Sequence, residues 1–229
     1  MTEAEWLATT ELGPSSLGLL PTRPRDRKLR PFAVAWCQRT ERFLGKDERL
    51  RQGLEVATRF AEGNATSAER RSARRAAQAF IETLRYRQAG SAVYNSLCKS
   101  SFLCAIYSKD DALRAIEREA VSNATSDGVD YRVAAKSARS CEAQAQLLIL
   151  RDLIGNPFHA VTIDPDWRTS TVVSLARQMY ESRDFSLMPI LSDALQDAGC
   201  ENDDFLSHFR DDGPHVRGCW VVDLLLGKE

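Results

Sequence analysis

Two of the three histidines and two of the six cysteines in this 229-residue chain lie within twenty positions of one another near its C-terminus. They are Cys200, His208, His215 and Cys219. Thiolate sulfur and imidazole nitrogen are ligands that zinc prefers, and two of each complete a tetrahedral site. The sequence therefore indicates a zinc site at these four residues.

The spacing within this set supports only part of the zinc prediction. His215 and Cys219 are separated by about one helical turn, which suits a pair of ligands. Cys200 and His208 are not spaced like a usual zinc pair, and the chain contains no Cys-x-x-Cys motif. In the alternative interpretation Cys219 is a core thiol, Cys200 follows a helix C-cap at Gly199, His208 caps the end of a short helix, and the protein needs no cofactor.

A second candidate site is basic and could bind an anion or a nucleic acid. Four arginines crowd the first turns of a predicted helix and two further cations precede it: Arg70, Arg71, Arg74, Arg75, Lys28 and Arg30. Cations near a helix N-terminus oppose its dipole at a cost of about 0.3–1 kcal/mol each, so an acidic partner or phosphate binding would explain them. No helix-turn-helix, RNP or zinc-finger signature accompanies the cluster. A solvated face, or docking onto the acidic C-terminal half, is the alternative.

Signatures of common enzyme classes are missing from the sequence. It has no Gly-rich phosphate loop, no GxSxG and no HExxH. Cys219 could pair with His208 or His215 as an activated nucleophile, but a chain with three histidines allows such pairings by chance. We therefore assign no catalytic residue and favour a protein that is not an enzyme.

Composition places the chain among ordinary globular proteins. Hydrophobic residues make up 43% and charged residues 28%, while Gly (12) and Pro (8) are sparse, which favours helices. No basic-then-apolar leader follows Met1, and no apolar run is long enough for a membrane span. We expect a cytoplasmic protein with reduced cysteines and no membrane partner.

Charge is distributed unequally along the chain. Residues 22–90 contain 17 Lys and Arg against 8 Asp and Glu, whereas residues 152–229 contain 6 against 14. Either the basic half binds an acidic partner, or the two halves face each other. We expect a single helical domain over 1–229, with the acidic subdomain (about 152–229) packed on the basic half (about 22–90).

The spacing of apolar residues predicts helices throughout, and no segment alternates with period two for long. We predict an all-α fold, either a multi-helix orthogonal bundle or a short stack of α-hairpins with a buried C-terminal helix. Pro31 should stand at the first position of its helix, and Thr66 with Glu69 should form a capping box. The expected helices span about 2–9, 31–44, 46–63, 67–84, 92–107, 111–122, 130–154, 170–182, 188–198, 203–209 and 216–226.

The last of these helices contains the densest apolar run of the chain. Helices that are apolar nearly all round are buried, so the C-terminus should be a core element rather than a frayed end. Asp223 is an anomaly there, because a buried carboxylate needs a partner, and we expect a basic residue of the N-terminal half to supply it.

Two short words occur twice in the chain. Lys46–Arg51 resembles Lys109–Arg114, and the sequence NATS occurs at 64–67 and again at 123–126. The second version is shorter by about one helical turn, which would keep a buried face in phase. The alternatives are a divergent helical repeat and the convergence of turn and cap sequences.

Both ends of the chain resemble a family of uncharacterised planctomycete proteins with many paralogues. The similar segments are MTEAEWLATT (1–10), DRKLRPFAVAWCQRTERF (26–43), GNPF (155–158), MPILSDALQDAGCENDDFLSHFR (188–210) and GPHVRGCWVVDLLLGKE (213–229). The resemblance implies a bacterial helical protein of no known activity with a variable middle region. The chain departs from the family at Pro31, Trp36 and Phe209, and the last two stand where the family leads us to expect Cys.

The combined observations favour a non-catalytic helical module that binds another protein through its middle region, about 64–140. A nucleic-acid-binding protein using the basic half is the first alternative. A small zinc-stabilised domain or an enzyme is the second.

Overall fold

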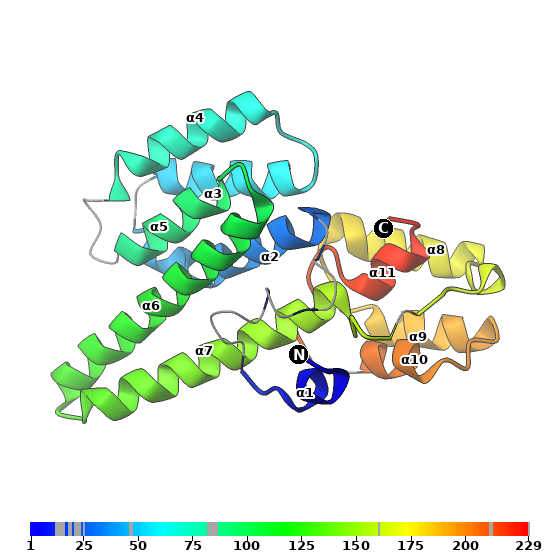
Figure 1. Ribbon diagram of the computed structural model, residues 1–229. Coiled ribbons are helices and arrows are strands. Elements are labelled where there is room, and N and C mark those ends of the chain that lie inside the picture. The colour runs from blue at the N-terminus through cyan, green and yellow to red at the C-terminus, as the bar shows by residue number, and fades with distance from the viewer. Residues whose placement is uncertain are drawn as a thin grey trace. The chain divides into compact units, whose positions relative to one another are not determined.

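The computed structural model describes residues 1–11, 17, 20, 24, 26–45, 48–81, 87–159, 161–210 and 213–228. Within these ranges it contains α-helices, short 3₁₀ turns and no strand, which confirms the predicted all-α fold (Figure 1). The chain divides into two compact units, a first unit over Glu3–Leu147 and a second unit over Leu148–Glu229. The packing of one charged half on the other stays a prediction.

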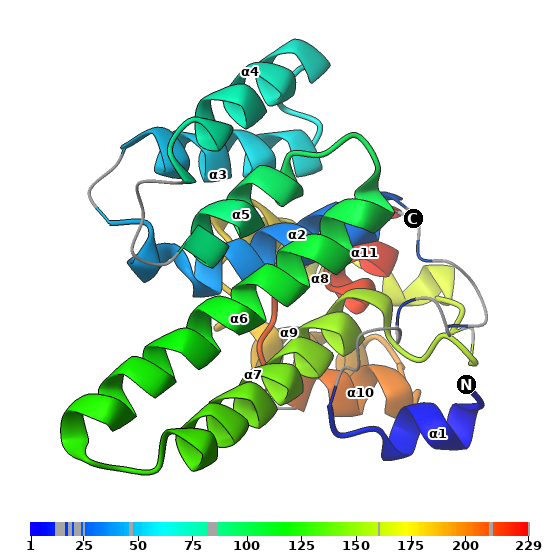
Figure 2. The ribbon, with the colours of Figure 1, turned by 60° about the vertical axis from the view of Figure 1, so that its left-hand side comes forward.

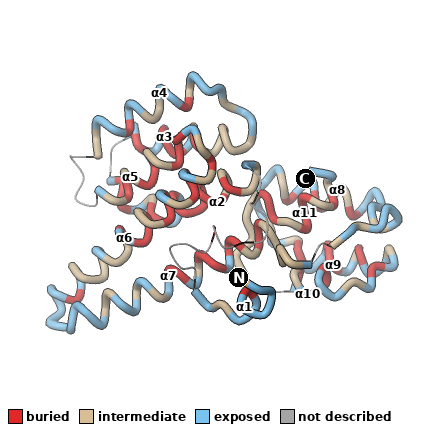
Figure 3. Tube along the Cα trace, in the orientation of Figure 1, coloured by how far each residue is buried: buried red, intermediate tan, exposed pale blue. Residues whose placement is uncertain are grey.

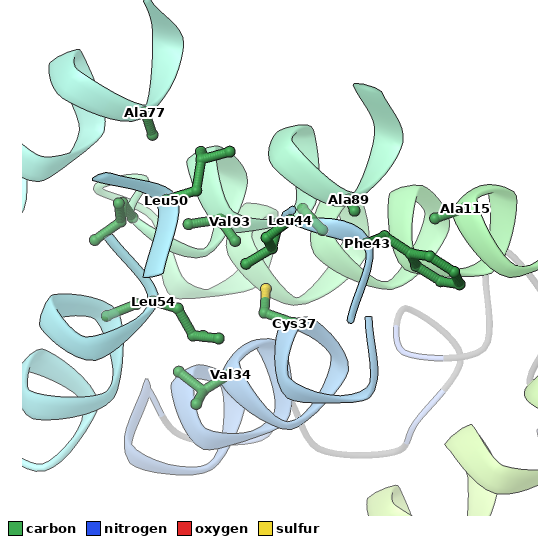
Figure 4. Close-up of a cluster of buried hydrophobic side chains, with 13 residues drawn as sticks. Val34, Cys37, Phe43, Leu44, Leu50, Leu54, Ala77, Ala89, Val93 and Ala115 are labelled. Carbon is green, nitrogen blue, oxygen red and sulfur yellow. The ribbon is translucent and has the colours of Figure 1, made fainter. Parts of the chain in front are cut away.

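The first unit contains α1 to α6 and most of α7. Its elements are α1 (Glu3–Ala8), α2 (Asp26–Arg39), a 3₁₀ turn (Glu41–Phe43), α3 (Glu48–Ala61), α4 (Ser67–Gln78), α5 (Arg87–Ser96), α6 (Ser101–Asp127) and α7 (Tyr131–Ile154). Helices α2, α3, α5 and α6 pack on one another, and α4 covers α3 and α5 (Figure 2). Small and aliphatic side chains fill the space between them, including Cys37, Leu50, Leu54 and Val93 (Figure 4).

The predicted capping box is confirmed at the start of α4. The Thr66 hydroxyl accepts from the Glu69 N–H at 3.1 Å, and the Glu69 carboxylate accepts from the Thr66 N–H at 2.7 Å. These reciprocal bonds satisfy two of the backbone donors that every helix start leaves open.

The predicted position of Pro31 is wrong. Helix α2 begins at Asp26, so Pro31 lies inside it. The turns before the proline are held by tertiary contacts: Asp26 accepts a hydrogen bond from the Ser101 hydroxyl, and Arg30 donates to the carbonyls of Cys98 and Lys99. These contacts join residues that are distant in the sequence, so local patterns cannot predict them. They compensate for the hydrogen bond that proline cannot make.

The predicted helices over 92–107 and 111–122 are also wrong in their boundaries. The real interruption lies at 97–100, and Ser100 begins the continuous helix α6. The two sequence words therefore occupy different settings, because Lys109–Arg114 lies within α6 whereas Glu48–Arg51 begins α3. NATS caps α4 in one case and lies inside α6 in the other, and Lys46 and Asp47 lie outside the described residues. This arrangement argues against a structural repeat.

The second unit comprises the end of α7 and all later elements. They are a 3₁₀ turn (Pro165–Trp167), α8 (Ser170–Ser182), α9 (Met188–Asp197), α10 (Asp203–Arg210) and α11 (Trp220–Leu225). The C-terminal run is a core element as expected, since Val221, Val222 and Leu225 are buried among residues of α8, α9 and α10. Helix α11 begins at Trp220 rather than at 216, because residues 216–219 form a turn. Asp223 is buried, and its pairing with the basic half stays a prediction.

A membrane-spanning helix was not expected, and among the described residues none combines the necessary length and apolar character.

Candidate metal centre

Four side chains of the second unit converge on one point. Asp152 lies near the end of α7, His208 in the last turn of α10, His215 in the following loop, and Cys219 directly before α11. One ligand atom from each residue lies within 4.8 Å of the others. We call this set the Asp–His–Cys cluster.

Short contacts join its members. His208 Nε2 lies 3.1 Å from Cys219 Sγ and 3.3 Å from Asp152 Oδ1. His215 Nδ1 lies 2.8 Å from the same carboxylate oxygen. Tetrahedral zinc with N, O and S ligands places neighbouring ligand atoms roughly 3.3–3.6 Å apart. The short pairs are therefore closer than zinc requires, while the widest spacing, 4.8 Å, is larger, so the side chains would have to adjust in both directions around the ion.

A sharp turn brings His215 and Cys219 to the same place. The N–H of Cys219 donates to the carbonyl of Val216 at 2.9 Å, which closes the turn, and Gly218 within it has φ of 100°. A side chain at that backbone conformation would be strained, so glycine is the suitable residue there. The turn reverses the chain between the two ligands before α11 begins.

The backbone also fixes Asp152. Its Oδ2 accepts from the Val216 N–H at 2.9 Å, which leaves Oδ1 directed at the two histidines. Burial raises the pKa of Asp152, but hydrogen bonds from His208 and His215 outweigh this effect and hold that pKa below its ordinary value. The cluster thus contains a buried carboxylate that hydrogen bonds from two imidazoles stabilise.

The cluster is closed to solvent. The side chains of Asp152, His215 and His208 are only 4%, 10% and 15% exposed, and Cys219 is fully buried. Burial, with the Asp152 charge as the second cause, raises the pKa of the Cys219 thiol well above its ordinary value. His215 Nε2, the ring nitrogen that does not contact Asp152, is buried and has no hydrogen-bond partner among the described residues.

A close contact between Gly155, directly after α7, and Trp220 of α11 supports the cluster. Gly155 has φ of 65°, and a Cβ there would lie 3.0 Å from the indole of Trp220. The indole in turn donates from Nε1 to His208 Nδ1 at 3.3 Å. The close approach of the α7 end to Trp220 therefore requires glycine at 155.

The structure brings together three of the four predicted zinc ligands and replaces the fourth. Cys200 is not a member of the Asp–His–Cys cluster. It follows Gly199 at the end of α9 and is buried among apolar residues of the second unit's core. Its unusual spacing from His208 already indicated this outcome, and the alternative interpretation, in which Cys200 follows the helix end at Gly199, agrees with the structure.

Sequence reasoning missed Asp152. The residue stands in the apolar helical segment LLILRDLIG (147–155). A carboxylate in such a run needs a partner, just as Asp223 does in the C-terminal helix. The same signal was therefore available at Asp152, but its partners lie 56 to 67 positions further along the chain.

The cluster does not have the geometry of a nucleophilic triad. A triad requires the carboxylate on one ring nitrogen of histidine and the nucleophile on the other. Here Asp152 and Cys219 both contact Nε2 of His208, while Nδ1 accepts from Trp220. Convergence of several possible ligand atoms on one point is instead the arrangement found around a bound cation.

The six residues of the predicted basic site have different surroundings in the fold. Arg70 is buried and donates to the Leu97 carbonyl, and Arg74 lies 4.2 Å from the centre of the Tyr94 ring. Arg30 donates to the carbonyls after α5. Arg71 and Arg75 are exposed and Lys28 is half-buried. Three of the six residues therefore have packing roles, and phosphate binding by this set stays a prediction.

Comparison of the chain with protein-family models, curated proteins and solved structures returns no match. The resemblance to the planctomycete family consequently stays a prediction, and function has to be inferred from the chemistry of the site.

Proposed function

We propose that the second unit binds one divalent transition-metal ion, zinc by preference, at Asp152, His208, His215 and Cys219. The observation that carries this proposal is the convergence of a thiol, two imidazoles and a carboxylate within 4.8 Å inside a closed site. Thiolate and imidazole select zinc over the hard cations magnesium and calcium, which take oxygen ligands.

The role of the metal is structural rather than catalytic. Catalytic zinc keeps one coordination position for water or substrate, whereas structural zinc has four protein ligands. Here four residues can fill the coordination shell, and none is exposed by more than 15%. The ion would join α7, α10, the following loop and α11. This agrees with a non-catalytic helical module in the cytoplasm, where the six unpaired cysteines would stay reduced.

Metal analysis of the purified wild-type protein tests the proposal. We expect one zinc per chain by mass spectrometry of the metal content. At a zinc concentration a thousandfold above Kd, binding stabilises the folded state by about 4 kcal/mol, so removal by a chelator should lower Tm by roughly 10 °C. Absence of stoichiometric metal after refolding with zinc or cobalt would overturn the proposal.

Trp220 provides a readout specific to this site. His208 Nδ1 accepts from the Trp220 indole, so Nε2 carries the proton of the ring. Coordination through Nε2 would move the proton to Nδ1, which then cannot accept. The Trp220 indole N–H signal should therefore shift on titration with zinc, while the signals of Trp6 and Trp36, in the first unit, should stay in place.

A second candidate function is the predicted binding of another protein. The connection of α6 and α7 is exposed (Figure 3). In it the apolar residues Val129, Tyr131 and Val133 are 57%, 49% and 63% exposed. Exposed apolar groups of this kind favour contact with a partner. If this connection binds a protein, Val129→Ser with Val133→Ser should abolish capture of a partner that the wild type retains. Ile190→Ser, at an equally exposed position of α9, is the control.

A further inference from the structure

A second group of reactive side chains lies in the first unit, at the connection between α5 and α6. Cys98 follows α5, and Cys104 lies in the first turn of α6. Their sulfur atoms are 2.8 Å apart, and the Cys104 thiol also contacts the Cys98 carbonyl at 3.2 Å. We call these two residues the dithiol pair.

Arginines from two other helices surround the pair. Arg30 of α2 donates to the Cys98 carbonyl at 3.2 Å, and the same Nη1 lies 3.7 Å from Cys104 Sγ. Arg70 of α4 donates to the Leu97 carbonyl. Arg74 of α4 has a buried Nε without a hydrogen-bond partner among the described residues. Positive groups at this density favour a negative charge on a neighbouring sulfur.

Their surroundings shift the pKa values of the two thiols in opposite directions. The hydrogen bond from Cys104 is the largest effect on Cys98, and with the charges of Arg74 and Arg30 it outweighs burial and lowers the pKa of Cys98 to about 7. The same hydrogen bond and burial raise the pKa of Cys104. Cys98 is therefore the more acidic thiol of the pair, and Cys104 is the thiol that keeps its proton.

We propose that Cys98 and Cys104 form a reversible redox site that a small peroxide oxidises to a disulfide. Cys98 is 7% exposed, whereas Cys104 is fully buried, so Cys98 is the more accessible residue of the pair. This order matches an attacking thiol followed by a resolving thiol. The site belongs to the first unit and does not depend on the metal centre.

The reaction balances in two steps. The Cys98 thiolate attacks hydrogen peroxide, an S–O bond forms, the O–O bond breaks, and hydroxide leaves, so that sulfur loses two electrons and becomes a sulfenic acid. Cys104 then attacks the Cys98 sulfur, an S–S bond forms and the S–O bond breaks. The Cys104 proton leaves with the hydroxyl group as water. Two electrons from an external thiol restore both cysteines.

Wild-type protein in the absence of reductant tests the proposal without any variant. After a stoichiometric peroxide treatment we expect a mass loss of about 2 Da and a Cys98–Cys104 linked peptide in a proteolytic map, both reversed by dithiothreitol. Cys141, which is exposed, should still be alkylated and serves as the internal control. Full alkylation of Cys98 and Cys104 after unfolding of the peroxide-treated protein would overturn the proposal.

Two variants separate the roles within the pair. Cys104→Ser should leave Cys98 as a sulfenic acid that dimedone labels, while Cys98→Ser should leave Cys104 reduced. Equal labelling of the two variants contradicts the assignment of Cys98 as the attacking thiol. If either variant fails to fold, the peptide map of the wild type still decides whether the disulfide forms.

Discussion

Cys98 in the first unit and Cys219 in the second unit have opposite surroundings. Cys98 lies near arginines and accepts from another thiol, and its pKa falls to about 7. Cys219 is fully buried and lies near the carboxylate of Asp152, and its pKa rises well above the ordinary value. Both residues belong to buried parts of helical units, and both contact a second group that can bind or lose a proton.

The difference teaches that burial alone does not decide what a cysteine does. A thiolate beside cations can exist without a metal and is available for nucleophilic attack. A thiol beside a carboxylate keeps its proton until a cation arrives and replaces it, because metal binding deprotonates its ligands. The first environment suits redox chemistry and the second suits a structural ion.

The largest expected effect concerns Cys219 and the metal centre. Cys219→Ser removes a soft ligand from a closed site and should abolish stoichiometric zinc binding. The loss of zinc stabilisation, about 4 kcal/mol at a thousandfold excess over Kd, should lower Tm by roughly 10 °C. Metal content and thermal unfolding measured on the same sample check this prediction.

Cys200→Ala is the matched control, because this cysteine is equally buried but lies outside the cluster. It should retain one zinc per chain even if its stability falls. Loss of zinc from both the Cys200 and the Cys219 variants would restore the ligand set predicted from the sequence.

A substitution at Gly155 tests the packing that supports the metal centre. Gly155→Ala combines a left-handed backbone conformation with a Cβ that lies 3.0 Å from Trp220. We expect a loss of about 2–4 kcal/mol in the free energy of unfolding, from backbone strain and overpacking together. Denaturant unfolding monitored by tryptophan fluorescence gives the value. Gly63→Ala shares the positive φ but has no neighbour within 4 Å, so it should cost only the backbone share.

The next prediction concerns the reactivity of Cys98. At pH 7 about half of Cys98 should be thiolate, against roughly 1% of a thiol with its pKa at 9.0, so its alkylation should be about 50-fold faster than that ordinary thiol at equal access. The rate of iodoacetamide labelling of Cys98 should rise with a midpoint near pH 7. Cys219 should show no such step below pH 9 in metal-free protein.

The same shift has a consequence for stability. The pKa of Cys98 is lower in the folded state than the ordinary value of 9.0. Its thiolate therefore contributes stability that is fully present above pH 9 and is lost as pH falls through about 7. Arg74→Gln should move the labelling midpoint upward, because it removes one of the charges that lower this pKa. An unchanged midpoint would assign the shift to the Cys104 hydrogen bond and Arg30 without a contribution from Arg74.

The smallest expected effect separates the two units. Thr66→Ala removes the capping box of α4 and should cost about 1 kcal/mol of stability. Because Thr66 belongs to the first unit, zinc content and the Trp220 signal should not change. Thr66→Ser, which keeps the hydroxyl group, should restore most of the loss in the same unfolding experiment.

The sequence by itself determined the elements whose information is local. Apolar spacing at helical intervals predicted the all-α fold, Thr66 with Glu69 predicted a helix start, and the terminal apolar run predicted a buried end. Each rests on residues a few positions apart, which contact one another in any helix. For the same reason His208, His215 and Cys219 were recognised together, since they lie within one short stretch of chain.

Only the tertiary structure decided the features that join distant residues. The structure placed Asp152 rather than Cys200 beside the histidines, and it showed that Pro31 lies in the interior of α2. It also brought the arginines of α2 and α4 to the cysteines at the connection between α5 and α6. None of these contacts follows from spacing along the chain. They arise because helices pack through their buried faces, and packing determines which polar groups have to satisfy one another.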